Sequence, residues 1–170
     1  MSHKIEDLNY SCENGRVTLY VTVGIPGSGK STWVRNNLQV SGKIIVALDE
    51  IRKKRYGFFP QNLNYDLESQ VWIEAISQAV RSIEARNDTV IDSMALTIEF
   101  RRKIFEMIAE RTDVKFNKIA IFIDTPVEVA IQRNYSRQKI VKKETILDMV
   151  RHLQEPTEGE GFDRVIRIKA

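Results

Sequence analysis

The residues best suited to chemistry lie between positions 24 and 32, which read Gly-Ile-Pro-Gly-Ser-Gly-Lys-Ser-Thr. Glycines at this spacing allow successive backbone N–H groups to turn inward and cradle the β- and γ-phosphates of a nucleotide. Lys30 adds a mobile positive charge, and the Ser31 hydroxyl is suited to bind Mg²⁺. The sequence therefore predicts a phosphate-binding loop (P-loop) made of Gly24, Pro26, Gly27, Ser28, Gly29, Lys30, Ser31 and Thr32.

The segments on either side of this loop have the composition that it needs. Residues 17–23 are apolar and β-branched, as in a buried strand, and residues 31–38 have helical spacing. A helix that begins at the loop directs its positive N-terminal partial charge at the same phosphates. The alternative is a glycine-rich turn with a surface lysine, which would leave the flanking strand and the two hydroxyls as coincidences.

Five apolar, β-branched runs alternate along the chain with segments of helical spacing. The runs cover residues 17–23, 43–48, 89–91, 118–123 and 165–168. Such alternation indicates a mostly parallel sheet covered by helices on both faces, with ligands at the carboxyl ends of the strands. We therefore expect an α/β fold, a three-layer sandwich of the P-loop NTPase type with five strands.

The composition fits one globular domain. The chain has 170 residues, of which 42% are hydrophobic and 29% charged, and its net charge is +3. We expect a loose arm over residues 1–15 and one domain over residues 16–170. No apolar run approaches the roughly 20 residues of a membrane span, the first residues lack a secretory signal, and Cys12 is the only cysteine. These features predict a cytoplasmic protein without a membrane partner.

Asp49 and Arg52 form the second group of candidate residues. Their spacing places both side chains on one face of a helical turn, directly after a predicted strand. The pair suits phosphoryl transfer to a hydroxyl, because the carboxylate can accept the proton while the guanidinium binds a neighbouring phosphate. Two alternatives remain open. Asp49 and Glu50 can form a hydrolytic pair in which Glu50 activates water, or Asp49 can cap a helix that begins at Glu50.

Two further aspartates also follow predicted strands, at the sheet edge where the loop lies. Asp92 is placed to reach Mg²⁺ directly or through a water molecule, although aspartate is also common in turns. Asp124 precedes Thr125 and Pro126, and proline is favoured in the first turn of a helix. We therefore expect Asp124 or Thr125 to cap the next helix.

Arg133 and Arg137 are spaced to lie one turn apart on the same helix face. Two such cations can close over the phosphates of ATP and neutralise the charge that develops on the transferred group, as an arginine finger supplied by the same chain. The alternative is that both side chains are solvated.

Taken together, these motifs resemble the kinase domain of phage-type polynucleotide 5′-kinases, from about residue 17 to the C-terminus. The motifs are the loop at 24–33, Asp49-x-x-Arg52, Val-Ile-Asp92 with Arg101-Arg102 downstream, and Asp124-x-Pro-x-Glu-x-x-x-x-Arg-Asn-x-x-Arg137. The closing Glu160-Gly-Phe-Asp-Arg-Val is similar to the terminal strand of related bacterial end-healing kinases.

The resemblance implies ATP and Mg²⁺ as cofactors and a DNA or RNA end as the acceptor. It implies that Lys30 and Ser31 hold the ATP phosphates and Mg²⁺, and that Asp49 is the general base for a 5′-hydroxyl. It further implies that Arg52 binds the acceptor's phosphate and that Arg137, with Arg133, forms a lid.

The chain departs from the family pattern after its third motif strand. The family commonly shows Asp-x-Thr-Asn there, whereas this chain has Asp92-Ser93-Met94-Ala95, so the acceptor is less defined than the ATP site. Met94 can form an apolar wall for a base or belong to the core. Similarly, a terminal base can stack on Tyr56, Phe58 or Phe59, with phosphates on the cations at 52–55. The alternative is that the phenylalanines pack under the sheet and the cations face water.

Three functions follow from these residues. The leading one is an ATP-dependent kinase that phosphorylates a nucleic-acid hydroxyl, above all the 5′-hydroxyl of DNA or RNA. The second keeps this chemistry but acts on a hydroxymethylated base in DNA or on a small molecule. The third is a non-kinase ATPase module.

Overall fold

The computed structural model describes residues 15–57 and 65–170. Most of the predicted arm at 1–15, together with Phe58 and Phe59, lies outside the described residues. The strands are β1 (Val17–Val23), β2 (Ile44–Ala47), β3 (Thr89–Asp92), β4 (Phe116–Asp124) and β5 (Arg164–Lys169). The helices are α1 (Lys30–Val34), α2 (Leu48–Tyr56), α3 (Tyr65–Glu84), α4 (Ile98–Ala109), α5 (Val127–Asn134) and α6 (Lys143–His152), with a π-helical stretch η2 (Arg35–Gln39) and a short 3-10 helix η3 (Glu158–Glu160).

The five strands form one sheet in the order β2-β3-β1-β4-β5, and every neighbouring pair is parallel. Each observed strand begins and ends within two residues of its predicted run. The sequence pattern succeeds here because parallel strands buried on both faces are continuously apolar. The predicted α/β fold of the P-loop NTPase type is confirmed.

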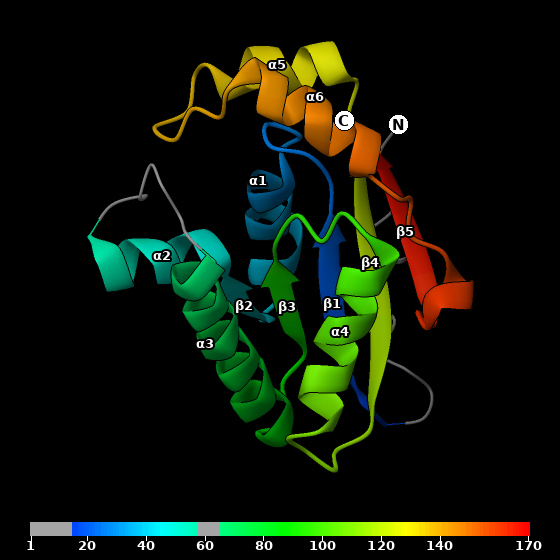
Figure 1. Cartoon of the computed structure of the whole chain (residues 1–170). Helices are drawn as coiled ribbons and strands as arrows, with labels where there is room; N and C mark the ends of the chain where they lie inside the picture. Colours follow the sequence, from blue (N-terminus) through cyan, green and yellow to red (C-terminus); the bar gives the residue numbers. More distant parts are fainter. Residues whose placement is uncertain (1–14, 58–64) are drawn as a thin grey trace.

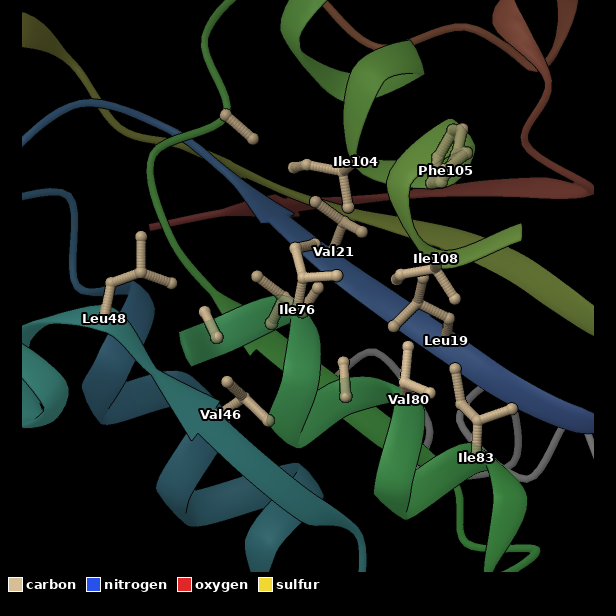
Figure 2. Close-up of a cluster of buried hydrophobic side chains, with 14 of the residues drawn as sticks. Leu19, Val21, Val46, Leu48, Ile76, Val80, Ile83, Ile104, Phe105 and Ile108 are labelled. Carbon is tan, nitrogen blue, oxygen red and sulfur yellow. The ribbon is translucent and has the colours of Figure 1, made fainter. Parts of the chain in front are cut away.

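Helices cover both faces of the sheet. On one face, Leu19 and Val21 of β1 pack with residues of α3 and α4 such as Ile76 and Ile104 (Figure 2). On the other face, Tyr20 packs with buried residues of α1 and η2. Every residue of β1 is buried, so the strand that leads into the P-loop is held rigidly at the centre of the sheet.

Helices α5 and α6 lie over the carboxyl ends of the strands (Figure 1). Ile25 of the P-loop, Ala130 of α5 and Ile146 of α6 form a small apolar cluster there. Gly27 has a φ of +80°, and a Cβ on this residue would lie 2.1 Å from the carbonyl oxygen of Ala130. Helix α5 therefore rests directly on the phosphate-binding loop, and only glycine fits at position 27.

The prediction that Asp124 or Thr125 caps the next helix is wrong, and so is the alternative that Asp49 is a cap. Helix α2 begins at Leu48, so Asp49 lies in its first turn and is not its cap. The N-cap of α5 is Pro126, and its side chain makes no capping hydrogen bond. Thr125 instead donates a hydrogen bond of 2.9 Å from its hydroxyl to the carbonyl of Ser28, and Asp124 pairs with Arg167. Both side chains thus make tertiary contacts, and Thr125 anchors the P-loop.

A buried ion pair fixes the segment that follows β3. Arg101 is fully buried, and its Nε and Nη2 donate to the Glu160 carboxylate at 2.6 and 2.9 Å. Its Nη1 donates to the carbonyl of Ala95 at 2.8 Å. Arg101 therefore ties α4, η3 and the chain after Asp92 together.

None of the described helices is long and apolar enough to cross a membrane.

Candidate active site

Lys30 begins helix α1, and its ammonium group lies inside the P-loop. Its Nζ donates a 2.8 Å hydrogen bond to the carbonyl of Ile25 and lies 3.4 Å from the hydroxyl oxygen of Ser28. Burial lowers the pKa of Lys30 to about 8, although Asp92 and Asp49 act in the opposite direction. A buried cation whose main contact is a neutral carbonyl is well placed to bind an anion.

Ser31 and Asp92 meet beside this lysine. The Ser31 hydroxyl hydrogen-bonds the carboxylate of Asp92 at the end of β3, and the hydroxyl of Thr22 lies 3.3 Å from the same carboxylate. Burial raises the pKa of Asp92, while Ser31 and Lys30 oppose that rise. A hydroxyl and a carboxylate are the hard oxygen ligands that Mg²⁺ prefers, and Mg²⁺ commonly uses one or two protein ligands plus substrate phosphates. The predicted pair of metal ligands therefore fits this ion.

Asp49 is surrounded by cations from two parts of the chain. Its Oδ1 accepts hydrogen bonds from Arg52 Nη1 at 2.7 Å and from Lys139 Nζ at 3.3 Å. Its Oδ2 lies 3.8 Å from Arg137 Nη2. Burial acts to raise the pKa of Asp49, but Lys139 and Arg52 together lower it below its usual value. The carboxylate is therefore ionised at neutral pH.

Arg52 is held by a second carboxylate that the sequence analysis missed. Its Nε donates to Glu68 Oε2 at 3.1 Å, and its Nη2 contacts Glu68 Oε1. Burial acts to lower the pKa of Arg52, but Glu68 and Asp49 raise it. Glu68 comes from α3, on the other side of an undescribed segment, so no local spacing connects it with Arg52. The guanidinium predicted to bind a phosphate already bridges two acids.

The two lid arginines do not share a helix face as predicted. Arg133 lies on α5 near the P-loop, since its Nη1 would be 3.7 Å from a Cβ built on Gly29. Helix α5 ends at Asn134, and Arg137 lies beyond its end. The cause is the side chain of Asn134, which donates to the carbonyl of Val141 at 2.7 Å and accepts from its N–H at 3.0 Å. These bonds fold residues 135–142 back toward the site and bring Arg137 and Lys139 to Asp49.

A cavity of about 680 Å³ joins these groups. Its lining includes seven predicted residues, namely Pro26, Lys30, Ser31, Asp49, Arg52, Asp92 and Arg137, together with Glu68 and Lys139. Its apolar lining includes Leu48, Trp72, Met94, Leu96, Phe100 and Met149. Met94 therefore forms part of the cavity wall. A groove of about 760 Å³ between α4 and α6 contains none of the predicted site residues.

Several other candidates lie outside this cavity. Arg133 and Glu50 are exposed and do not line it. Tyr56 is half-buried, packs against the core and donates a 3.2 Å hydrogen bond to the carbonyl of Leu67. Tyr56 therefore joins α2 to α3 and does not line the cavity.

Comparison with known proteins gives a family and a set of similar folds. Residues 19–156 match the model of a family described as AAA domain. A search of curated proteins finds no significant match.

Solved structures resemble the fold at low identity. A chain of the Pnkp1/Rnl/Hen1 RNA repair complex is 22% identical with a TM-score of 0.67, and the match covers 82% of this chain and 44% of that one. A gluconokinase from Sinorhizobium meliloti 1021 is 18% identical with a TM-score of 0.56, covering 89% of this chain and 82% of that one. The APS kinase CysC of Mycobacterium tuberculosis is 16% identical with a TM-score of 0.58, covering 89% and 88%. The chain therefore shares its P-loop NTPase-type fold with these structures and belongs to the AAA-domain family whose model it matches.

Proposed function

We propose that the protein is an ATP-dependent kinase that transfers the γ-phosphate of ATP to a nucleic-acid hydroxyl, above all the 5′-hydroxyl of DNA or RNA. One observation carries the proposal. The carboxylate of Asp49 shares one cavity with Lys30, Ser31 and Asp92, so a carboxylate base and a phosphate-binding loop face the same space.

Asp49 takes the proton of the acceptor hydroxyl in this mechanism. As the acceptor oxygen bonds to the γ-phosphorus, the bond from that phosphorus to its bridging oxygen breaks and ADP leaves. Lys30 and Arg137 neutralise charge on the transferred group, because both line the cavity beside Asp49. Bound Mg²⁺, held through Ser31 and Asp92, would supply further charge neutralisation at the phosphates.

The choice of a nucleic-acid acceptor rests on two supports. The motifs around Asp49 and Arg137 resemble those of polynucleotide 5′-kinases. In addition, one of the similar folds occurs in an RNA repair complex. The similarity to a gluconokinase and an APS kinase supports the second candidate, a kinase of a small hydroxyl compound, since these folds are comparably similar.

The test uses ATP labelled in its γ-phosphate and a panel of acceptors. We expect label on a 5′-hydroxyl oligonucleotide and none on the same oligonucleotide with a 5′-phosphate. Label only on a sugar, or only on internal hydroxymethylpyrimidine, would replace the proposed acceptor. If the protein hydrolyses ATP steadily without any acceptor, and Glu50→Gln abolishes this hydrolysis, the protein is an ATPase and the proposed kinase activity is wrong.

A further inference from the structure

We propose that the apolar end of the catalytic cavity is a base-binding subsite, in which Trp72, Phe100, Met94 and Met149 receive the nucleobase of the acceptor's 5′-terminal nucleoside. The inference rests on the proposed function and adds what recognises the acceptor. The aromatic contact then comes from α3 and α4, and not from the segment around Tyr56.

The two aromatic residues form a preassembled wall. The Trp72 and Phe100 rings make an edge-to-face contact, with centroids 4.7 Å apart and an interplanar angle of 82°. Both are partly buried residues that pack against the core, and both also line the cavity. A ring that is fixed by core packing and by a neighbouring ring loses little conformational entropy when a ligand stacks on it.

Two methionines add further apolar lining to this cavity. Met94 and Met149 line the same cavity, and thioether sulfurs make favourable contacts with aromatic rings. The backbone at Met94 is tied to the start of the P-loop, because its carbonyl accepts a 3.1 Å hydrogen bond from the N–H of Gly24. A nucleobase would cover this apolar surface, which is otherwise in contact with water.

The charges beside the wall favour an uncharged ring over a phosphate. Glu68 lines the cavity with 32% of its side chain exposed, and its carboxylate is held by Arg52. Because Glu68 lies one helical turn before Trp72 on α3, a phosphate at this end would meet its carboxylate. The guanidinium of Arg52 bridges Glu68 to Asp49, so one planar group joins the acid near the wall to the proposed base. A nucleoside has a matching layout, because one sugar separates its base from its 5′-hydroxyl.

The first test measures binding apart from catalysis. The sequence has two tryptophans, so Trp33→Phe leaves Trp72 as the only one. Trp33 packs with the opposite face of the sheet, away from the aromatic wall. In the Trp33→Phe variant, we expect a 5′-hydroxyl oligonucleotide to quench the fluorescence of Trp72. The same oligonucleotide with an abasic 5′-terminal residue should leave this fluorescence unchanged. Equal quenching by both would overturn the inference.

The second test uses steady-state kinetics. We expect Trp72→Ala to raise the KM for the oligonucleotide about tenfold and to leave the KM for ATP unchanged, because one stacked base is lost. Trp72→Phe keeps a ring and should retain most of the affinity. Ile73→Ala changes the next residue of α3, which is 55% exposed and does not line the cavity, so it should have no effect.

The abasic acceptor separates the inference from the proposed function. For the wild type, the abasic residue should raise the KM for the oligonucleotide by the same factor as Trp72→Ala does. For the Trp72→Ala variant, the abasic residue should not raise this KM further. If the wild type phosphorylates the intact and the abasic oligonucleotide equally well, the inference is wrong while the proposed function stands. If it phosphorylates neither, the proposed function is wrong and the subsite falls with it.

Discussion

Lys139 donates a 3.3 Å hydrogen bond to Oδ1 of Asp49, although the two residues are 90 positions apart in the sequence. The contact joins the segment after α5 to the first turn of α2. Oδ1 of Asp49, the proposed base, thus has two cationic partners, Arg52 and Lys139. The position of this carboxylate and its pKa therefore depend on a residue outside the motif that predicted it.

Replacing Lys139 should change the pH dependence of the reaction. Lys139 and Arg52 hold the pKa of Asp49 below its usual value, and Arg137 adds a third positive charge 3.8 Å from Oδ2. The base works only when ionised, so its activity is lost as the pH falls through this pKa. Lys139→Met removes one cation and raises the pKa, and the acid limb of the kcat/KM profile should move to higher pH.

The matched control for that profile is Lys142→Met, an exposed lysine in the same segment that does not line the cavity. Its acid limb should coincide with that of the wild type. An acid limb that stays in place in Lys139→Met would show that Lys139 does not tune the base.

Replacing Glu68 should affect both stability and the base. Glu68→Gln leaves the buried guanidinium of Arg52 with Asp49 as its remaining carboxylate partner, and we expect a loss of about 1–2 kcal/mol in the free energy of unfolding. The freed guanidinium interacts more strongly with Asp49, so the acid limb of the kcat/KM profile should move to lower pH. Urea denaturation and the pH profile measure the two effects.

Helix α3 also offers a matched control for this variant. Glu74 is 3.9 Å from Arg81 in a pair whose side chains are 38% and 65% exposed, and Glu74→Gln should change the free energy of unfolding by less than about 0.5 kcal/mol. Equal stability of the two variants would contradict the role given to Glu68.

The Arg101–Glu160 pair should be the most sensitive electrostatic contact among the described residues. Both side chains are essentially fully buried, so Glu160→Gln leaves a buried guanidinium without its countercharge, at a cost of about 3–5 kcal/mol. Arg167→Gln, which breaks exposed pairs with Asp124 and Glu155, should cost less than about 1 kcal/mol. Denaturant unfolding compares the two, and similar midpoints would contradict the account.

Local pattern explains what the sequence could predict. The P-loop and the strand before it are continuous in sequence, and Asp49 and Arg52 are one helical turn apart, so spacing alone indicates their arrangement. Lys139 is only two residues beyond Arg137, but nothing in its spacing singled it out.

The remaining contacts depend on packing between distant segments. Glu68 reaches Arg52 from the next helix, and Glu160 pairs with an arginine 59 positions earlier. Helical spacing also placed Arg137 wrongly, because it could not show that the side chain of Asn134 would bind Val141 and end α5. A polar side chain that competes for backbone groups is a known signal of helix ends, but its partner depends on the fold.

The most direct test of the central claim compares wild type with Asp49→Asn in the transfer of labelled phosphate to a 5′-hydroxyl oligonucleotide. The substitution keeps the shape of the side chain and removes its ability to accept the proton. We predict that the variant still folds and binds ADP, with transfer at least about 100-fold slower. Transfer by Asp49→Asn at a rate close to that of the wild type would contradict the assignment of Asp49 as the base.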